Sequence, residues 1–165
     1  MADKILYLIG GTMGVGKTAV SRELKLLLDG CVFLDGDWCW DMYPFVVNDA
    51  TKAMVLDNIC ACLGNFLQCP QIRNIVFCWV MHEQGIIDEI LSRLDLTACT
   101  VRSVSLTCTE AELRRRLQRD IDAGVRTADI LDRSPARLPL YEKLDTVKFD
   151  TTGKTPQQIA REILG

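Results

Sequence analysis

The sequence GTMGVGKT, residues Gly11 to Thr18, matches the pattern G-x-x-x-x-G-K-[ST] of phosphate-binding loops. That pattern requires a strand before the loop and a helix after it. Residues 5–9 form a continuous apolar run, which is typical of a buried parallel strand. Residues 20–28 carry leucine and valine at helical spacing, and Asp29-Gly30 ends the run. The loop therefore lies where a strand turns into a helix, and we build the rest of the fold outward from it.

The residue types of this loop suit a polyphosphate. Backbone N–H groups must approach the phosphates closely, and glycines lack the Cβ atom that would block the approach. Those N–H groups and the positive end of the following helix dipole form an anion cradle. Lys17 adds a positive charge between the β- and γ-phosphates, and Thr18 offers a hydroxyl ligand to Mg²⁺. A glycine-rich turn without a ligand is the alternative, but the Lys-Thr pair at the required positions favours nucleotide binding.

Length and charge limit the classes of protein to consider. The chain has 165 residues and no linker-like stretch, so we expect one domain over residues 1–165. Its net charge of −3 argues against non-specific binding to nucleic acid or to an anionic membrane. The apolar runs are too short to span a bilayer, and the first residues lack the body of a signal peptide. We therefore expect a cytoplasmic protein, either monomer or homodimer, that binds neither nucleic acid nor membranes.

The chain has eight cysteines, most of them inside predicted strands and helices. A nucleotide-binding enzyme in a reducing compartment keeps its thiols reduced, so we expect small buried free cysteines in place of disulfides. Cys60, Cys62 and Cys69 are the alternative, as metal ligands. They lack a second pair at zinc spacing, and the single histidine, His82, is remote in sequence, so free thiols are favoured.

Two aspartates follow the second apolar run. Residues 31–34 predict a strand that leads directly into Asp35-Gly36-Asp37. Residues two apart in an extended chain project to the same side, so both carboxylates can face the crevice at the carboxyl end of the sheet. A surface Asp-Gly turn is the alternative. The phosphate-binding loop just upstream favours the functional interpretation.

An aromatic cluster comes next and has two interpretations that the sequence leaves open. Trp38, Trp40, Tyr43 and Phe45 fall within eight positions and could wall a substrate pocket or form ordinary core under a loop. Lys52 is the only cation between Trp38 and Ile72. Because enzymes generally hold an anionic substrate group with arginine, this stretch predicts a neutral or cationic acceptor.

The remaining sequence alternates predicted helices and strands. Alternation at these lengths indicates parallel βαβ units with right-handed crossovers. His82, just after the third strand, could contact a ligand, although a structural histidine is the favoured interpretation. We expect helices over about 48–69, 86–94 and 156–164, a helix from Thr109, and strands over about 74–80, 99–106 and 146–149.

Arginines gather in the last third of the chain. Seven of them lie within residues 110–137, where six acidic residues are interleaved. A solvated helix face explains some of these side chains. The segment 123–139 adds glycine, serine and two prolines, and it is typical of a lid over bound phosphates.

Taken together, the chain resembles the small P-loop kinases of the shikimate kinase, gluconate kinase, adenylylsulfate kinase and chloramphenicol phosphotransferase kind, and the related AAA-type nucleotide kinases. The resemblance covers nearly the whole length. It is carried by the loop 11–18, by residues 34–37, by the arginine helix leading to the lid, and by the terminal stretch 150–156. It implies a three-layer α/β/α P-loop NTPase fold, with a five-stranded parallel sheet in the order 2-3-1-4-5 and a short lid at about 123–139.

The resemblance also implies roles for individual residues. Asp37 would contact or deprotonate the acceptor hydroxyl, and Thr18 and Asp35 would hold Mg²⁺. Lys17, Asp37, Arg119 and Arg133 would be the catalytic residues, and Arg115 or Arg116 would stack on adenine. The expected contacts to ATP are Gly11, Met13, Gly14, Val15, Gly16, Lys17, Thr18, Ala19, Arg115, Arg116, Gly153 and Pro156.

One departure from the family pattern concerns the third strand. It ends in Val80-Met81-His82 and so offers no carboxylate of the kind that many P-loop proteins use to hold magnesium. Asp35 must then be the carboxylate that holds magnesium. The sequence thus predicts an ATP- and Mg²⁺-dependent phosphotransferase acting on a hydroxyl of a small molecule. A P-loop ATPase or nucleotide-dependent switch, and a nucleoside or nucleotide kinase, are the alternatives.

Overall fold

The computed structural model describes residues 4–165 and contains one parallel sheet. Its five strands run in the spatial order β2-β3-β1-β4-β5, as the sequence predicts. Each neighbouring pair is parallel, and β1 lies at the centre between β3 and β4. The strands are β1 (Lys4–Gly10), β2 (Cys31–Asp35), β3 (Asn74–Trp79), β4 (Cys99–Thr107) and β5 (Val147–Asp150).

The sheet is covered on both faces, which explains why its central strands are continuous apolar runs. Successive side chains of β1 point to opposite faces, so Leu6 and Leu8 enter one core cluster while Tyr7 and Ile9 enter the other. Ile75 and Phe77 of β3 join the first cluster. An alternating pattern would have left one face to solvent, so the apolar runs themselves require two layers of helices.

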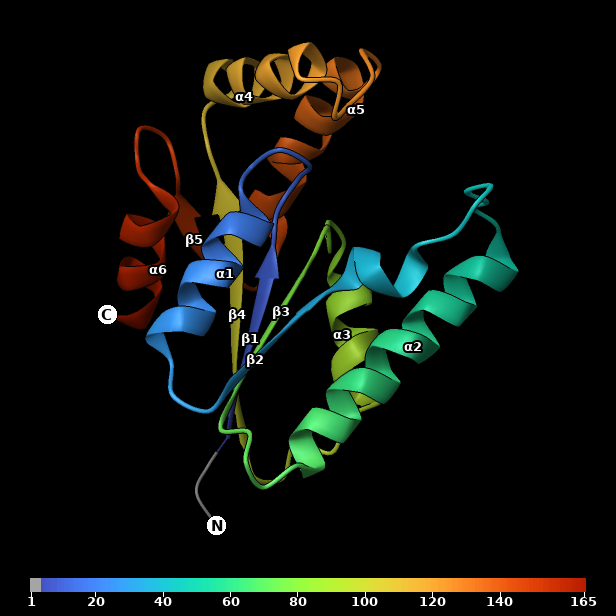
Figure 1. Cartoon of the computed structure of the whole chain (residues 1–165), viewed down its shortest axis with the longest axis vertical. Coiled ribbons are helices and arrows are strands. Elements are labelled where there is room, and N and C mark those ends of the chain that lie inside the picture. Colours follow the sequence, from blue (N-terminus) through green and yellow to red (C-terminus); the bar gives the residue numbers. More distant parts are fainter. Residues whose placement is uncertain (1–3) are drawn as a thin grey trace.

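Figure 1 shows how the helices are layered. One face of the sheet carries α1 and α6, the other carries α2 and α3, and α4 and α5 lie over the end at which the strands terminate. The helices are α1 (Lys17–Leu27), α2 (Asp49–Gln68), α3 (Gln84–Ser92), α4 (Glu110–Asp122), α5 (Ile130–Arg137) and α6 (Pro156–Leu164). Two 3₁₀ segments, η1 (Gly36–Trp40) and η2 (Leu138–Lys143), complete the fold.

Local capping explains several helix boundaries. Asn48 caps α2 by accepting from the backbone N–H of Thr51 at 2.9 Å, and the Thr51 hydroxyl accepts from the backbone N–H of Asn48 at 3.0 Å. Thr109 caps α4 by accepting from the N–H of Glu112. The segment proposed as a lid, 123–139, is more regular than its composition suggests, because α5 occupies residues 130–137 of it.

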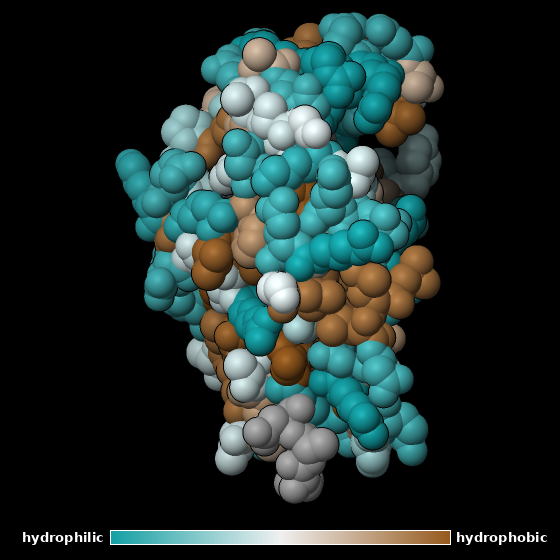
Figure 2. All heavy atoms as spheres, turned by 90° about the vertical axis from the view of Figure 1, so that its left-hand side faces the viewer, coloured by the Kyte–Doolittle hydropathy of each residue, from teal (hydrophilic) through white to brown (hydrophobic). Residues whose placement is uncertain are grey.

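The surface and the cysteines agree with the sequence-based expectations. Figure 2 views the side of the molecule that carries α6 and α1, and hydrophilic side chains cover most of it, with smaller apolar areas between them. Among residues 4–165, no helix combines the length and the apolar character needed to cross a bilayer. All eight cysteines are free thiols, as predicted, but only Cys78 and Cys108 are buried and the other six are half-buried.

Candidate active site

The loop between β1 and α1 has the backbone conformation that its glycines predict. Gly14 and Gly16 have φ angles of 86° and 110°, in the left-handed region that side chains with a Cβ rarely adopt. A Cβ at Gly14 would lie 2.5 Å from Leu117 Cδ2, whereas the space beside Gly16 holds no atom within 4 Å. Gly14 is therefore required by packing against α4, and Gly16 leaves room at the start of α1 for an anion.

Lys17 lies where the strand, the loop and the helix meet. Its Nζ donates to the backbone carbonyl of Thr12 at 3.0 Å, which folds the side chain back along the loop. Burial lowers the pKa of Lys17 to about 8, while Asp37 and Asp35 act in the opposite direction. A negatively charged ligand beside the ammonium would favour its charged form and offset that burial cost.

Thr18, Asp35 and Asp37 form one connected group across two elements. The Thr18 hydroxyl on α1 donates to Asp35 Oδ2 at 2.8 Å, and Asp35 Oδ1 accepts from the backbone N–H of Asp37 at 3.0 Å. Asp35 is buried at the end of β2, and that second contact makes it the N-cap of η1. The end of β2 places Asp35 beside Thr18, whereas Asp37 lies in η1 and not in the extended chain on which the spacing argument rested.

The environment of Asp37 suits a proton acceptor. Partial desolvation raises its pKa above the ordinary aspartate value, and the like charge of Asp35 adds to the effect, while Lys17 and a hydrogen bond from Trp79 oppose it. Trp79 fixes the turn on which Asp37 lies, because its ring packs against Gly36, where a Cβ would come within 2.6 Å. A raised pKa brings a carboxylate closer to the range in which it can take a proton.

The donor set suits magnesium only together with a nucleotide. A hydroxyl and a carboxylate are the oxygen ligands that Mg²⁺ prefers, and Thr18 and Asp35 already lie within hydrogen-bonding distance of each other. Within residues 4–165, no group of three or more His, Cys, Asp or Glu side chains could hold a metal by itself. The residues fit an ion that is held partly by phosphate oxygens.

The third strand ends differently from the second. Met81, with φ 39°, turns the chain and packs under Gly10, and His82 follows it. Burial and the nearby Arg137 lower the pKa of His82, so its imidazole is neutral at pH 7. His82 Nδ1 is buried and finds no hydrogen-bond partner in the part of the chain that the structure describes. This end of β3 supplies no carboxylate, which leaves Asp35 as the acidic group beside Thr18.

Arg116 connects the phosphate-binding loop to the loop after β5. Its guanidinium donates to Glu112 at 2.7 Å, to the carbonyl of Val15 at 2.9 Å, and to both the hydroxyl and the carbonyl of Thr151 at 2.9 Å. The side chain is only 13% exposed. The sequence left Arg115 and Arg116 open as adenine partners, and these four bonds give Arg116 a structural role that sequence spacing did not reveal.

The other predicted arginines lie at the surface. Arg115 is 63% exposed and pairs with Glu112, whose pKa its hydrogen bonds hold at about 2. Arg133 pairs with Asp129 at 3.6 Å, and Arg119 is exposed on α4. Among residues 4–165, none of these three makes a hydrogen bond or ion pair with the loop 11–18. Their predicted roles remain predictions.

Arg126 is a site residue that the sequence analysis did not single out. Its positive charge lowers the pKa of both Lys17 and Asp37, which places the guanidinium within electrostatic reach of the loop and of the proposed base. Its Nε donates to Asp120 at 3.1 Å. Arg126 belongs to the segment 123–139 that the sequence predicts as a lid, and it adds a candidate to the predicted arginines of that segment.

A buried contact that no motif signals anchors α5 to the phosphate-binding loop. The Thr12 hydroxyl lies 2.8 Å from the carbonyl and 2.7 Å from the hydroxyl of Ser134, and the Ser134 hydroxyl donates to the carbonyl of Met13 at 2.5 Å. Thr12 and Ser134 are both fully buried. The loop is thus held between its own helix and a helix that begins more than a hundred residues later.

The loop after β5, which was predicted to meet the nucleotide, contacts Arg116 of α4 through Thr151. Gly153, with φ 70°, makes the turn that follows β5, and Thr155 caps α6, in which Pro156 is the first residue. Thr152 Oγ1 accepts from the backbone N–H of Thr109 at 3.0 Å, so this turn also contacts the start of α4. Ala19 lies exposed in the first turn of α1.

Comparison with known proteins identifies the family. Residues 8–133 match the family model described as an AAA domain, which spans more than half of the chain. The chain belongs to this family. Among curated proteins it is similar to a shikimate kinase from Halorhodospira halophila (strain DSM 244 / SL1), with 26% identity over 178 residues, covering 96% of this chain and 90% of that protein. Family and relative together make it a small P-loop kinase.

Solved structures support the same fold for this small P-loop kinase. A gluconokinase from Sinorhizobium meliloti 1021 superposes with a TM-score of 0.68 at 19% identity, covering 99% of this chain and 90% of that one. A shikimate kinase from Acinetobacter baumannii in complex with shikimate gives 0.66 at 22% identity, covering 98% and 90%. Coverage of this extent confirms the three-layer fold over the length of the chain.

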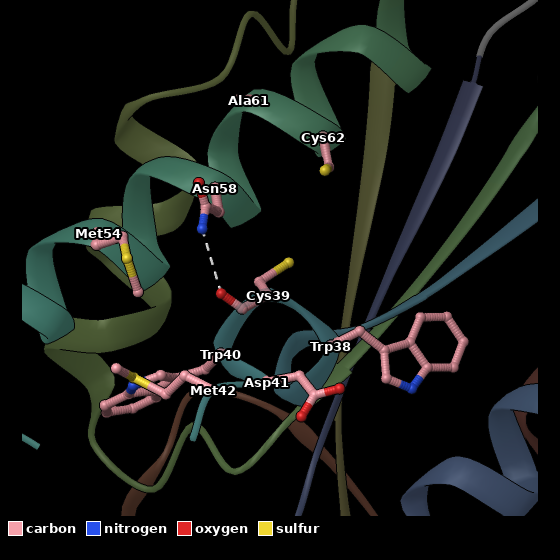
Figure 3. Close-up of a pocket in the computed structure, with 9 residues that line it drawn as sticks. All are labelled: Trp38, Cys39, Trp40, Asp41, Met42, Met54, Asn58, Ala61 and Cys62. Carbon is pink, nitrogen blue, oxygen red and sulfur yellow. Dashed lines mark hydrogen bonds between the residues drawn. The ribbon is translucent and has the colours of Figure 1, made fainter. Parts of the chain in front are cut away.

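The aromatic cluster of the kinase is not ordinary core. Tyr43 is fully exposed, Trp38 is 53% exposed and Phe45 is 63% exposed. Trp38 and Trp40 are both among the residues around a surface pocket between η1 and α2, but Figure 3 shows the Trp38 indole turned away from α2, and that ring packs edge-on against Phe33. Of the two interpretations that the sequence left open, the geometry favours the pocket wall for Trp40, which also packs against the core.

Proposed function

We propose that this small P-loop kinase transfers the γ-phosphoryl group of ATP to a hydroxyl of a small molecule. The observation that carries the proposal is the group formed by Lys17, Thr18, Asp35 and Asp37, which the fold assembles at the carboxyl end of β1 and β2. Phosphoryl transfer depends mainly on positioning and on neutralising charge, and this group offers both.

The residues would divide the work as follows. The backbone of the loop 11–18 binds the phosphates, and Lys17 holds positive charge beside the transferring group. Thr18 and Asp35 would hold Mg²⁺, which supplies charge neutralisation at the phosphate oxygens. Asp37 takes the proton from the acceptor hydroxyl as its oxygen bonds to the γ-phosphorus and the bond to the bridging oxygen breaks, releasing ADP.

Arginines of α4 and the lid would complete the nucleotide site. Arg126 already lies within electrostatic reach of Lys17 and Asp37, so we assign it to the transferring phosphate. Arg115 is exposed and bonds only to Glu112, so it would be the one to meet adenine, whereas Arg116 is held by four hydrogen bonds to three residues. Arg119 and Arg133 would reach the phosphates only after a movement of α4 and α5 on nucleotide binding.

An assay of acceptor dependence tests the proposal against its alternative, a nucleotide-dependent switch or ATPase. The purified chain is given γ-labelled ATP and Mg²⁺ with and without hydroxyl compounds, starting with shikimate and gluconate, which the names of its relatives suggest. A kinase should release little phosphate alone and should label an acceptor. Steady hydrolysis that no acceptor changes would instead support the switch.

A further inference from the structure

A pocket adjoins the proposed base and is large enough for a small molecule. It begins one residue after Asp37, and its volume is about 560 Å³, in the range of small-molecule sites. One side comes from η1 and the residues after it, and the other from α2, as Figure 3 shows. Its lining comprises Trp38, Cys39, Trp40, Asp41, Met42, Met54, Asn58, Ala61 and Cys62.

The lining is rich in sulfur-containing residues, with Trp40 beside them. Two tryptophans, two methionines and two cysteines account for six of its nine residues. Such groups favour an apolar or aromatic ligand surface, because ring faces and polarisable thioethers pack well against it. Asn58 donates to the carbonyl of Cys39 at 3.2 Å, which ties the two sides together and leaves its side-chain oxygen available as an acceptor.

Charge in the pocket has one sign. Asp41 is its only charged lining residue, and it makes no ion pair among residues 4–165. The proposed base, Asp37, adds a second negative charge next to the pocket. An anionic ligand would therefore meet two carboxylates and no lining cation, which is unfavourable by like-charge repulsion and by desolvation.

The arginines that could have supplied a cation are placed elsewhere. Arg73 lies just before β3, at the opposite end of that strand from the phosphate-binding loop, and pairs with Asp29 at 3.5 Å. Arg93 bonds to Asp57 at 2.7 Å and also to Glu89. Arg137 lies near His82, and neither it nor Arg133 lines the pocket.

We infer that the acceptor is a hydroxyl compound with an apolar or aromatic body and without a carboxylate or phosphate group. The inference rests on the proposed function, because it assumes that the pocket beside Asp37 holds the acceptor. It differs from what the names of the relatives suggest, because shikimate and gluconate are carboxylates and the inference predicts that Asp41 and the absence of a lining cation exclude them.

Matched acceptor pairs test the charge rule. The two pairs are phenyllactate methyl ester with phenyllactate, and uridine with uridine 5′-monophosphate. Binding is followed by tryptophan fluorescence, because two of the three tryptophans line the pocket, and transfer is followed with labelled ATP. We expect the uncharged member to bind and react at least about tenfold better in each pair. Equal or better binding of the anionic member would overturn the inference. So would a failure of both uncharged compounds to bind at concentrations of about 10 mM.

A charge introduced into the pocket gives a second test with a matched control. Ala61→Arg places a guanidinium in the lining, and Ala53→Arg adds the same charge at an exposed position of α2 outside it. Arginine is a good helix former, so both variants should fold. Ala61→Arg should shift the binding preference toward phenyllactate by about tenfold, and Ala53→Arg should not. Equal shifts in both variants would contradict the inference.

The two readouts separate this inference from the proposed function. Selective binding of uncharged compounds without transfer from ATP would uphold the inference about the ligand and refute the kinase reaction at this site. Transfer to the anionic members in preference would uphold the kinase and refute the inference.

Discussion

At the scale of single residues, the site depends on side chains whose charges oppose or support one another. Burial lowers the pKa of Lys17 to about 8, and Asp37, with a raised pKa, lies close enough to counteract that effect. Thr18 and Asp35 are joined at 2.8 Å. Lys17 and Asp35 are held by hydrogen bonds to uncharged groups, and removal of each charge should affect a defined step.

Substitution of Lys17 tests the loop assignment. Lys17→Ala removes the charge that stabilises the transferring phosphoryl group, so turnover should fall by about two to three orders of magnitude. Steady-state kinetics with labelled ATP measure the loss. Lys25→Ala, on the same helix, is the control and should keep its activity. Unchanged ATP binding and turnover in Lys17→Ala would show that the loop does not hold the nucleotide.

The two aspartates should separate by role. Asp37→Asn cannot accept a proton, so it should reduce kcat by about two orders of magnitude while ATP affinity stays unchanged. Asp35→Asn should instead raise the Mg²⁺ concentration needed for half-maximal activity. Mg²⁺ titrations and kinetics on both variants provide the comparison. Identical behaviour of the two variants would contradict the division of labour.

The raised pKa of Asp37 predicts a pH dependence. The base acts only when ionised, so kcat/KM should increase with pH through the pKa of Asp37 and level off above it. Because desolvation and Asp35 raise that pKa, the acidic limb should lie above the ordinary aspartate range. A pH profile measures it, and Asp37→Asn should abolish that limb. A limb unaltered in the variant would assign it to another group.

At the scale of elements, two helices far along the chain hold the phosphate-binding loop. Arg116 of α4 bonds to the carbonyl of Val15, and Ser134 of α5 bonds to the carbonyl of Met13. These bonds satisfy two carbonyls of the loop and so hold its shape. Only α5 lies within the segment 123–139 where a lid was expected, because α4 ends at Asp122. The position of α5 and the shape of the loop are therefore coupled.

Arg116→Lys tests the first of these connections. Lysine keeps the charge but cannot reproduce the four hydrogen bonds, so the free energy of unfolding should fall by about 2 kcal/mol. Arg115→Lys is the matched control, because Arg115 is exposed and should change stability by less than about 0.5 kcal/mol. Urea denaturation of both variants gives the two values. Equal losses would remove the structural role of Arg116.

Ser134→Ala tests the second connection. The substitution leaves the Met13 carbonyl without its partner and reduces the contacts of the buried Thr12 hydroxyl to the Ser134 carbonyl, so α5 should detach more readily. We expect KM for ATP to rise several-fold with a smaller change in kcat. Ser92→Ala, at the exposed end of α3, is the control. A change confined to kcat would indicate that Ser134 acts on the chemical step.

At the scale of the whole molecule, the parallel sheet brings segments that are far apart in sequence together at the carboxyl ends of its strands. All five strands are parallel, so the turns after β1, β2 and β3 lie at the same end of the sheet, where α4 and α5 lie over the loop after β1. The pocket between η1 and α2 adjoins this end of the sheet, because η1 directly follows β2. Nucleotide and acceptor can therefore be held by different elements and still meet at Asp37.

How much of this arrangement follows from the sequence depends on the range of the interactions. The loop 11–18, the aspartate pair and the strand order could be predicted, because they rest on local geometry, apolar patterning and family resemblance. The contact between Thr12 and Ser134 spans 122 residues, and the direction of Arg116 depends on how α4 packs on Gly14. Neither has a local signal. Likewise, Trp40 of the aromatic cluster became part of a pocket wall only where α2 lies opposite η1, since side-chain burial is set by tertiary packing and not by residue type.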